Sequence, residues 1–336
     1  MVVMKHLKNF HISMAALLLP LLCGVTLAAC QKDLCDDHSH GGANLSVRFD
    51  WSGEPDAAPA TMALTVFADG AQPVQTGFHG REGGEASLSP NTYRLIGFND
   101  DTESLFARGG TWADYEIYAQ ETVLSRVTRM FQGTRTAPQA RGTEDESVVF
   151  EPDELWTSAA EGVTVTADST QVVTMPMESA ITDYNFTITN VENLSYAVEV
   201  MATLSGMSAS WLPARHRGSD THCIIPFPLT GDGSSVLRGT VRTFGHCPGE
   251  DADDHAEHQL TIYAEMKDGS KVYFVSDVTE AMHDDDHTDP GDGGTGHTEI
   301  PIVIDQLPLP KPITNGSGLQ PAVSEWTEVE ISIPMN

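Results

Sequence analysis

Hydrophobic residues alternate with polar ones in many short segments of the chain. Val47, Phe49 and Trp51 are separated by the polar residues Arg48 and Asp50. Successive side chains of a β-strand point to opposite faces, so a period of two predicts a strand with one buried face. Turn residues such as Pro, Asn, Asp and Gly separate the segments. In the first half, strands are expected at residues 47–51, 62–66, 86–88, 93–98, 147–150, 163–165 and 172–175.

The same pattern starts again at Tyr184, after a break at Pro176. Further strands are expected at residues 184–188, 196–200, 223–227, 236–244, 259–265, 272–275, 300–304 and 329–333. No convincing amphipathic helix separates the early strands, which favours antiparallel sheets over a parallel sheet with crossover helices. The sequence therefore predicts an all-β fold with two β-rich domains, residues 43–177 and residues 181–336.

The first 29 residues have the pattern of an export signal. A short basic segment containing Lys5 and Lys8 precedes the apolar run Met14 to Leu27, and Ala28 and Ala29 lie directly before Cys30. The apolar run is shorter than the roughly 20 residues that a transmembrane helix needs. Residues 27–30, Leu-Ala-Ala-Cys, resemble the lipobox of bacterial lipoproteins, which predicts cleavage before Cys30 and lipidation of its sulfur. The alternative is an ordinary signal peptide in which Cys30 is incidental.

Residues 30–42 form an acidic and histidine-containing tether in this interpretation. Asp33, Asp36 and Asp37 follow the cysteine and resemble the acidic signal that directs lipoproteins of the Bacteroidetes to the outside of the outer membrane. We therefore expect a lipid-anchored protein of the outer membrane that is exposed at the cell surface. A periplasm-facing location is the alternative.

The composition is strongly acidic. The formal net charge is −30, and it becomes −32 without residues 1–29, which hold two lysines and no acidic residue. Such a surface repels nucleic acid and anionic lipid, so neither is an expected partner.

Two of the five cysteines, Cys223 and Cys247, lie in the predicted second domain. In the oxidising cell envelope they are candidates for a disulfide, which would stabilise the fold by about 3 kcal/mol through closure of its loop. Two free thiols are the alternative.

Histidine and aspartate concentrate in three tracts, residues 36–42, 247–258 and 283–297. Imidazole favours zinc or copper and carboxylates favour calcium, so the third tract is a candidate site for a divalent metal. Its spacing matches no closed zinc motif and no EF-hand, and the alternative is a set of solvated polar loops. No other cofactor is expected. The candidate ligands are His283, Asp284, Asp286, His287 and His297.

Motifs for nucleophilic or metal-dependent hydrolysis are missing from the sequence, so we do not expect an enzyme. Tryptophans raise the separate possibility of stacking on a carbohydrate. Trp51 and Trp326 lie in alternating segments and are expected in the core. Trp112 and Trp211 lie in segments expected to be loops and are the candidate ligand contacts.

Several longer segments resemble a known family. These are VRFDWSG (47–53), PNTYRLIGFNDDTE (90–103), SVVFEPDELW (147–156), LRGTVRTFG (237–245), LTIYAEMKDGSKVYFVSDVTEAM (260–282) and WTEVEISIPM (326–335). They are similar to a Bacteroidetes family of surface lipoproteins of unknown function (DUF5119-like), which is related to fimbrillin-type and fimbrial anchor proteins. The resemblance covers nearly the whole chain after the signal, and its motifs are structural.

The resemblance implies two tandem transthyretin-like antiparallel β-sandwich domains. It also implies a structural or adhesive component of a fimbria-like system, whether subunit, anchor or accessory protein, whose partners are fimbrial subunits joined by strand addition. The alternative is a stand-alone surface lipoprotein that binds a glycan or a divalent metal.

Overall fold

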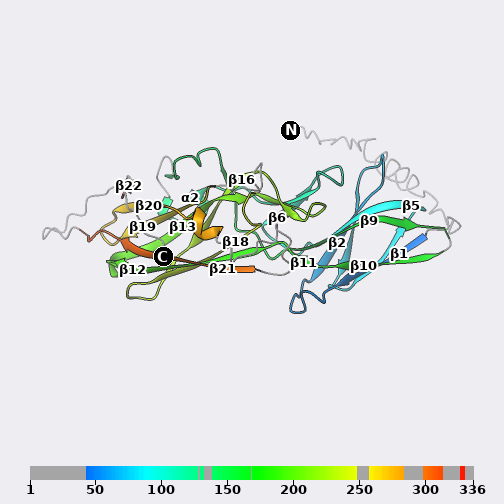
Figure 1. Ribbon diagram of the computed structural model, residues 1–336, viewed down its shortest axis with the longest axis horizontal. Coiled ribbons are helices and arrows are strands. Elements are labelled where there is room, and N and C mark those ends of the chain that lie inside the picture. Colours follow the sequence, from blue (N-terminus) through cyan, green and yellow to red (C-terminus); the bar gives the residue numbers. More distant parts are fainter. Residues whose placement is uncertain are drawn as a thin grey trace, which may run out of the picture. The chain divides into compact units, whose positions relative to one another are not determined.

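A computed structural model of the chain describes residues 43–127, 129–131, 138–167, 169–247, 257–283, 298–312 and 326–329 (Figure 1). The chain divides into two units, Met1–Gly42 and Ala43–Asn336. All described residues belong to the second unit, so the predicted signal, tether and lipidated Cys30 lie outside them. The described residues form an all-β protein, as the sequence predicts.

Two sheets form the first part of this unit. The three-stranded sheet has the order β10-β1-β4, with β1 parallel to β10 and antiparallel to β4. The five-stranded sheet has the order β11-β9-β5-β2-β3 and is antiparallel throughout. The strands are β1 (Ala43–Asp50), β2 (Thr61–Phe67), β3 (Val74–His79), β4 (Gly83–Leu88), β5 (Asn91–Asn99), β9 (Trp156–Val165), β10 (Thr170–Pro176) and β11 (Glu178–Ser179).

A hydrophobic core joins these two sheets face to face. Leu45, Val47 and Phe49 of β1 are buried against Leu64 of β2 and Leu95 of β5. This is the buried face that the alternation in residues 47–51 predicts, and Trp51 is buried with it. The Phe49 ring needs a glycine opposite it, because a Cβ at Gly97 would lie 2.6 Å from Phe49 Cε1.

Strands β2 and β5, at the centre of the five-stranded sheet, are buried on both faces. Leu95 packs into the core just described, whereas its neighbours Ile96 and Phe98 pack into a second and larger core. Strand β2 likewise sends Leu64 to one core and Phe67 to the other. This explains why these strands read as nearly continuous hydrophobic runs, a pattern typical of sheets covered on both sides.

Two further sheets form the second part of the unit. One has the order β17-β18-β12-β21, in which β12 and β21 are parallel, and the other has the order β22-β20-β19-β13-β16-β8. In Figure 1 the labels β12, β13, β19 and β20 fall in one group of strands and β1, β2, β5 and β9 in another. The strands are β8 (Ser147–Val148), β12 (Thr182–Glu192), β13 (Ala197–Ser208), β16 (His222–Pro228), β17 (Thr230–Gly231), β18 (Leu237–Thr243), β19 (Gln259–Met266), β20 (Lys271–Asp277), β21 (Thr298–Pro308) and β22 (Trp326–Glu328).

A small fifth sheet has the order β15-β14-β7-β6. It combines β6 (Leu105–Arg108) and β7 (Glu116–Ala119) with β14 (Ser210–Leu212) and β15 (Arg217–Gly218), and β8 pairs with β16. These pairings cross the domain boundary that the sequence predicts near residues 177–181. The short helical turns are α2 (Leu124–Val127), η2 (Arg129–Phe131), η3 (Leu194–Tyr196) and α3 (Thr279–Met282).

Replacement of Leu95 by Ala tests the first core. Leu95 is fully buried, so its loss should reduce the free energy of unfolding by about 2–5 kcal/mol through lost burial and an unfilled cavity. Val172→Ala on β10 is the matched control, because that side chain is 58% exposed, and it should cost less than about 1 kcal/mol. Urea denaturation of both variants measures the difference, and equal costs would contradict this description of the core.

Candidate functional site

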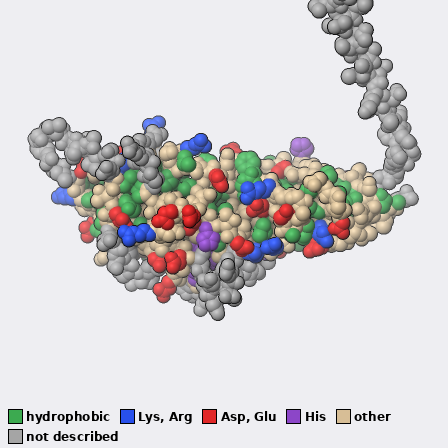
Figure 2. All heavy atoms as spheres, turned by 90° about the horizontal axis from the view of Figure 1, so that it is seen from above, with side chains coloured by type: hydrophobic (Ala, Val, Ile, Leu, Met, Phe, Trp, Pro, Cys, Tyr) green, Lys and Arg blue, Asp and Glu red, His purple; other side chains and the backbone are tan. Residues whose placement is uncertain are grey.

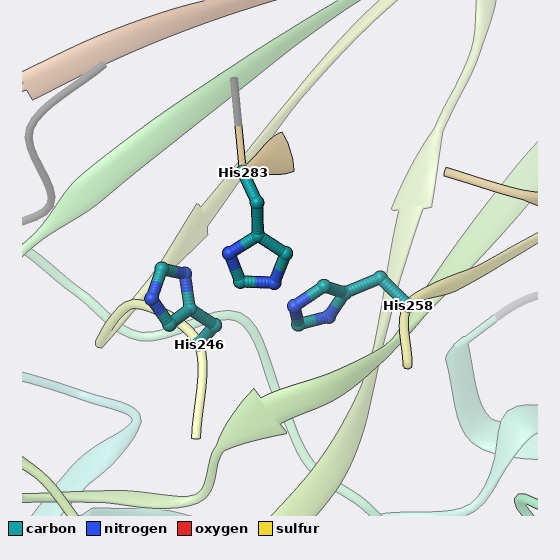
Figure 3. A group of neighbouring side chains, drawn as sticks. All are labelled: His246, His258 and His283. Atoms are coloured by element: carbon teal, nitrogen blue, oxygen red, sulfur yellow. The ribbon is translucent and has the colours of Figure 1, made fainter. Parts of the chain in front are cut away.

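Three histidine side chains converge at one end of the second pair of sheets (Figure 3). His246 follows β18 and forms an isolated bridge with Met207 at the end of β13. His258 lies directly before β19, and His283 lies directly after the short helix α3. Segments that are distant in sequence therefore bring the three imidazoles together.

The rings face one another at short distances. The ring centroids of His246 and His283 are 4.5 Å apart, those of His258 and His283 are 5.1 Å apart, and those of His246 and His258 are 5.9 Å apart. One nitrogen atom from each ring can be chosen so that all three lie within 4.8 Å of one another.

His258 is held in place by hydrogen bonds at the backbone and the ring. Its backbone N–H donates to Thr279 Oγ1 at 2.9 Å, and its backbone carbonyl accepts from Val278 N–H at 2.9 Å. Its Nδ1 lies 3.0 Å from the carbonyl oxygen of Ser205, which can only accept, so Nδ1 carries the proton. This tautomer leaves a lone pair on Nε2, which is buried and has no hydrogen-bond partner among the described residues.

The electrostatic surroundings keep His258 neutral. The pKa of this imidazole is lowered to about 3, mainly by burial and to a smaller extent by the neighbouring His246 and His283, while the Ser205 hydrogen bond acts in the opposite direction. A neutral ring keeps the Nε2 lone pair available as an acceptor or as a metal ligand. We define the histidine cluster as His246, His258 and His283. It therefore offers at least one nitrogen lone pair, that of His258 Nε2, in a fixed orientation.

An irregularity in β13 creates this environment. The register of β13 against β16 shifts between Leu204 and Met207, a β-bulge that contains Ser205 and Gly206. Gly206 has a φ of +75°, and a Cβ there would lie 2.5 Å from the carbonyl oxygen of Glu257. The bulge presents the Ser205 carbonyl to His258, and the Gly206 N–H donates to Glu146 Oε2 at 3.0 Å.

Burial raises the pKa of the Glu146 carboxyl to about 7, although the Gly206 hydrogen bond acts in the opposite direction.

The predicted metal ligands divide between the described residues and the rest. His283 is part of the histidine cluster, whereas Asp284, Asp286, His287 and His297 lie outside the described residues. His246 and His258 were missing from the predicted ligand set. The signal that could have pointed to them was the acidic, histidine-containing tract at residues 247–258, which ends at His258 and begins one residue after His246.

The predicted disulfide between Cys223 and Cys247 is not present, because both residues are buried free thiols. Cys223 and His246 pair with Met207 from opposite sides, so β13 lies between the two cysteines. Neighbouring strands are about 4.8 Å apart, and residues on either side of a strand are therefore farther apart than the roughly 6.8 Å that a disulfide spans between Cα atoms. Burial raises the pKa of both thiols, that of Cys247 to about 12, which keeps them protonated.

The two tryptophans predicted as ligand contacts both pack against the larger core, Trp211 fully and Trp112 in part. Trp211 is fully buried, and its Nε1–H donates to Thr157 Oγ1 at 3.1 Å. Trp112 is half-buried and packs edge-on against Phe67, with ring centroids 5.8 Å apart. Trp211 cannot stack on a sugar, which corrects that part of the prediction. Trp112 lies in the turn between β6 and β7, as the sequence predicts, whereas Trp211 lies in β14.

A groove of about 560 Å³ lies beside the first residues of β13. Most of its lining is apolar, and it includes Val198, which is 65% exposed. Ser195, Glu199 and Thr230 are the polar side chains that line it. This lining offers an apolar surface and lacks a set of groups arranged for acid–base chemistry.

The edges of the second pair of sheets differ in their capacity to accept another strand. Strand β16 carries Pro226 and Pro228 opposite Thr203 and Met201 of β13. The Ile224 carbonyl accepts from Val149 N–H, on the side away from β13, so the backbone of Pro226 and Pro228 faces the same way. Proline has no N–H to donate, and this edge is therefore blunted.

Strand β21 forms a different kind of edge. It pairs with β12 over Thr182↔Thr298 to Glu192↔Pro308 and with no other described strand. Pro301 cannot donate to β12, so its backbone faces away, and with a period of two the backbone of Val303 faces away as well. The Val303 side chain is 49% exposed. The edge lacks an outward N–H at Pro301, and its outward backbone groups from Val303 onward are those that a strand of another chain can pair with.

Charged side chains are mixed on the surface. On the face drawn in Figure 2, Lys and Arg side chains stand singly among Asp and Glu, with no continuous basic area among the residues coloured by type. A polyanion that approached this face would meet carboxylates beside the cations. Within the described part of the chain, the helices are all too short and too polar to span a bilayer.

The fold and these surfaces define a class of protein, built of packed β-sheets, with an open strand edge and no recognisable catalytic constellation among the described residues. Residues 28–228 match the family described as "Domain of unknown function (DUF5119)". The chain belongs to this family, as the sequence resemblance indicated.

Individual relatives extend the comparison. A protein of Bacteroides ovatus named "Putative fimbrium anchoring subunit Fim4B" is 23% identical over 98% of this chain and 100% of its own length. A crystal structure of a "putative adhesin" from the same species matches with a TM-score of 0.61 and 18% identity, covering 82% of this chain and 95% of that chain. The fimbrial anchor protein Mfa2 from Porphyromonas gingivalis matches with a TM-score of 0.48 and 12% identity, over 79% of this chain and 90% of that chain. The adhesin structure supports the fold described above.

Glu146 should make stability depend on pH. Its folded-state pKa of about 7 lies above the ordinary value of 4.5, so the folded chain binds more protons than the unfolded chain between these values. The stabilising contribution is complete below pH 4.5 and is lost as the pH rises through 7. Glu146→Gln keeps an acceptor for Gly206 and cannot ionise, so it should gain stability relative to the wild type between pH 5 and pH 8.

Urea denaturation of the wild type and Glu146→Gln at pH 5 and at pH 8 measures this gain in the free energy of unfolding. Glu144→Gln, which removes an exposed carboxylate two residues away, is the control and should show a smaller change. A Glu146→Gln difference that stays constant from pH 5 to pH 8 would show that this carboxyl does not titrate as described.

Proposed function

We propose that the chain is a surface-exposed lipoprotein of the outer membrane that acts as a structural or adhesive component of a fimbria-like system, most simply as its anchor. The observation that carries this proposal is the likeness to a fimbrium anchoring subunit, which extends from end to end of both chains. The family itself has no assigned function, so the proposal rests on that relative and on the surfaces of this chain.

We assign the described sheets to two tandem transthyretin-like sandwiches, in line with the sequence prediction. The three- and five-stranded sheets make up the first, and the four- and six-stranded sheets make up the second. Strands β7 and β8 precede residue 177 but pair with β14 and β16 of the second half. The contact between the sandwiches is therefore built from both halves of the chain, which suits a part that must transmit force.

The tether follows from the lipobox-like residues. Lipidation of Cys30 would place more than one acyl chain at the start of the mature protein, and stable membrane anchoring needs more than one chain. The acidic residues that follow would keep the linker solvated. In this arrangement the lipid holds the protein at the membrane and the sheets meet the fimbrial partner.

The β21 edge is the surface that we assign to that partner. Strand addition supplies main-chain hydrogen bonds along an exposed edge, and side-chain pockets give specificity. The blunted β16 edge on the other sheet does not compete for the added strand. The glycan-binding alternative loses Trp211 as a stacking platform because that ring is buried. The metal-binding alternative is supported by the histidine cluster.

Cys30→Ser tests the tether. In bacteria fed a clickable palmitate, the wild-type chain should be labelled and should sediment with the outer membrane. The Cys30→Ser variant should lose all the label and leave the membrane fraction. Cys35→Ser, five residues further along, should keep the label at the wild-type level, and loss of label in both variants would contradict the assignment to Cys30.

Val303→Pro tests the β21 edge. The substitution removes one outward N–H from an edge strand, where proline is tolerated, so the chain should still fold. Mixed with the candidate fimbrial subunit, the wild type should form a complex that survives mild detergent, and the variant should lose at least about 10-fold in affinity, in keeping with a lost set of hydrogen bonds.

Val303→Thr keeps the N–H and the side-chain shape and is the matched control. It should bind like the wild type. If Val303→Pro also binds like the wild type, the partner does not use this edge. If the wild type itself never binds any fimbrial subunit, the fimbrial proposal fails.

A further inference from the structure

We propose that His246, His258 and His283 together bind one divalent transition-metal ion, with Zn²⁺ as the best match, and that this ion fastens three chain segments to one another. The proposal is independent of the fimbrial function, because it rests only on the geometry of the histidine cluster.

The donor set determines the class of ion. Neutral imidazole nitrogens bind zinc, copper, nickel and cobalt, whereas calcium and magnesium need oxygen ligands. The cluster offers three imidazoles, a number that zinc sites use when a water molecule or another group occupies the fourth position. A doubly charged ion at this place also reduces the repulsion within a chain whose formal net charge is −30.

The surroundings of His258 are those of a metal ligand. A histidine that binds a metal usually donates its second ring N–H to a carbonyl or carboxylate, which fixes the tautomer and the ring orientation. His258 makes this bond to the Ser205 carbonyl at 3.0 Å. Its side chain is fully buried, and its Nε2 has no hydrogen-bond partner among the described residues. A buried acceptor left without a partner is costly, and a bound metal ion removes that cost.

The geometry needs a small closure. Zinc–nitrogen bonds of about 2.0–2.1 Å in a tetrahedral site place the ligand nitrogens about 3.3 Å apart. The ligand atoms of the cluster lie within 4.8 Å of one another, so they must approach by up to about 1.5 Å. His246 and His283 are half-buried, and each lies beyond the end of a regular element, so rotation of their side chains can supply this movement while His258 stays fixed.

The position of the ligands gives the site a structural role. His246 follows β18, His258 begins β19, and His283 ends the turn after β20, so the ion would bind the ends of three segments that meet beside the β13 bulge. Bound metal stabilises the folded state because the unfolded chain does not hold the three ligands together.

Zinc titration of the full chain in detergent, after treatment with a chelator, tests the proposal. Calorimetry should show one equivalent of Zn²⁺ bound with a Kd in the micromolar range or tighter. Zinc at about 100 times the Kd should raise the melting temperature by about 5 °C, whereas Ca²⁺ and Mg²⁺ should not. The Co²⁺ form should show the intense visible absorption of a four-coordinate ion.

The variants separate this site from other histidines of the chain. His246→Asn with His283→Asn should lose the one-equivalent step, the rise in melting temperature and the four-coordinate Co²⁺ spectrum. His79→Asn with His216→Asn removes two histidines elsewhere and should retain all three signals. His258→Gln is a further test, provided that circular dichroism in chelator shows it folded.

Weak zinc binding by the remaining histidines occurs in both double variants, so it does not affect the comparison between them. Either of two results would overturn the proposal. One is a wild-type chain with no stoichiometric zinc step, and the other is a His246→Asn, His283→Asn variant that keeps the step at unchanged affinity.

Discussion

The fold depends on one sheet that separates two hydrophobic cores. Alternate residues of β5 serve different cores, since Leu95 faces one and Ile96 and Phe98 face the other. A shift of register by a single residue would exchange these faces. The Phe98 side chain would then take the place of Gly97, where the Phe49 ring leaves no room even for a Cβ atom. The pairing of β5 with β2 and β9 is therefore fixed by packing on both sides.

Much of the fold was accessible from the sequence, because alternation follows directly from the geometry of a strand. The segments around Phe49, Tyr184 and Val241 are strands with one buried face, as the pattern predicts. What alternation could not show is which faces meet. The pairing of β8 with β16 joins residues about 75 positions apart, and no local signal marks it. For the same reason Trp211 looked accessible although it lies in the core.

The candidate site was predictable only in part. Composition drew attention to histidine near residues 258 and 283, but it could not show that His246 would join them. That convergence depends on the bulge at Ser205 and Gly206, which shifts the end of β13 and opens room beside His258. The spacing of Cys223 and Cys247 likewise could not show that strand β13 lies between them in the fold.

The prolines on β16 have a consequence for how many neighbours this chain can hold. Pro226 and Pro228 remove donors from the outer side of β16, whereas β21 pairs with β12 and with no other described strand. A building block that is receptive on both sides propagates a filament, whereas one with a single receptive side ends it. In the proposed fimbrial role, a chain that accepts its neighbour through β21 alone would end a filament instead of extending it.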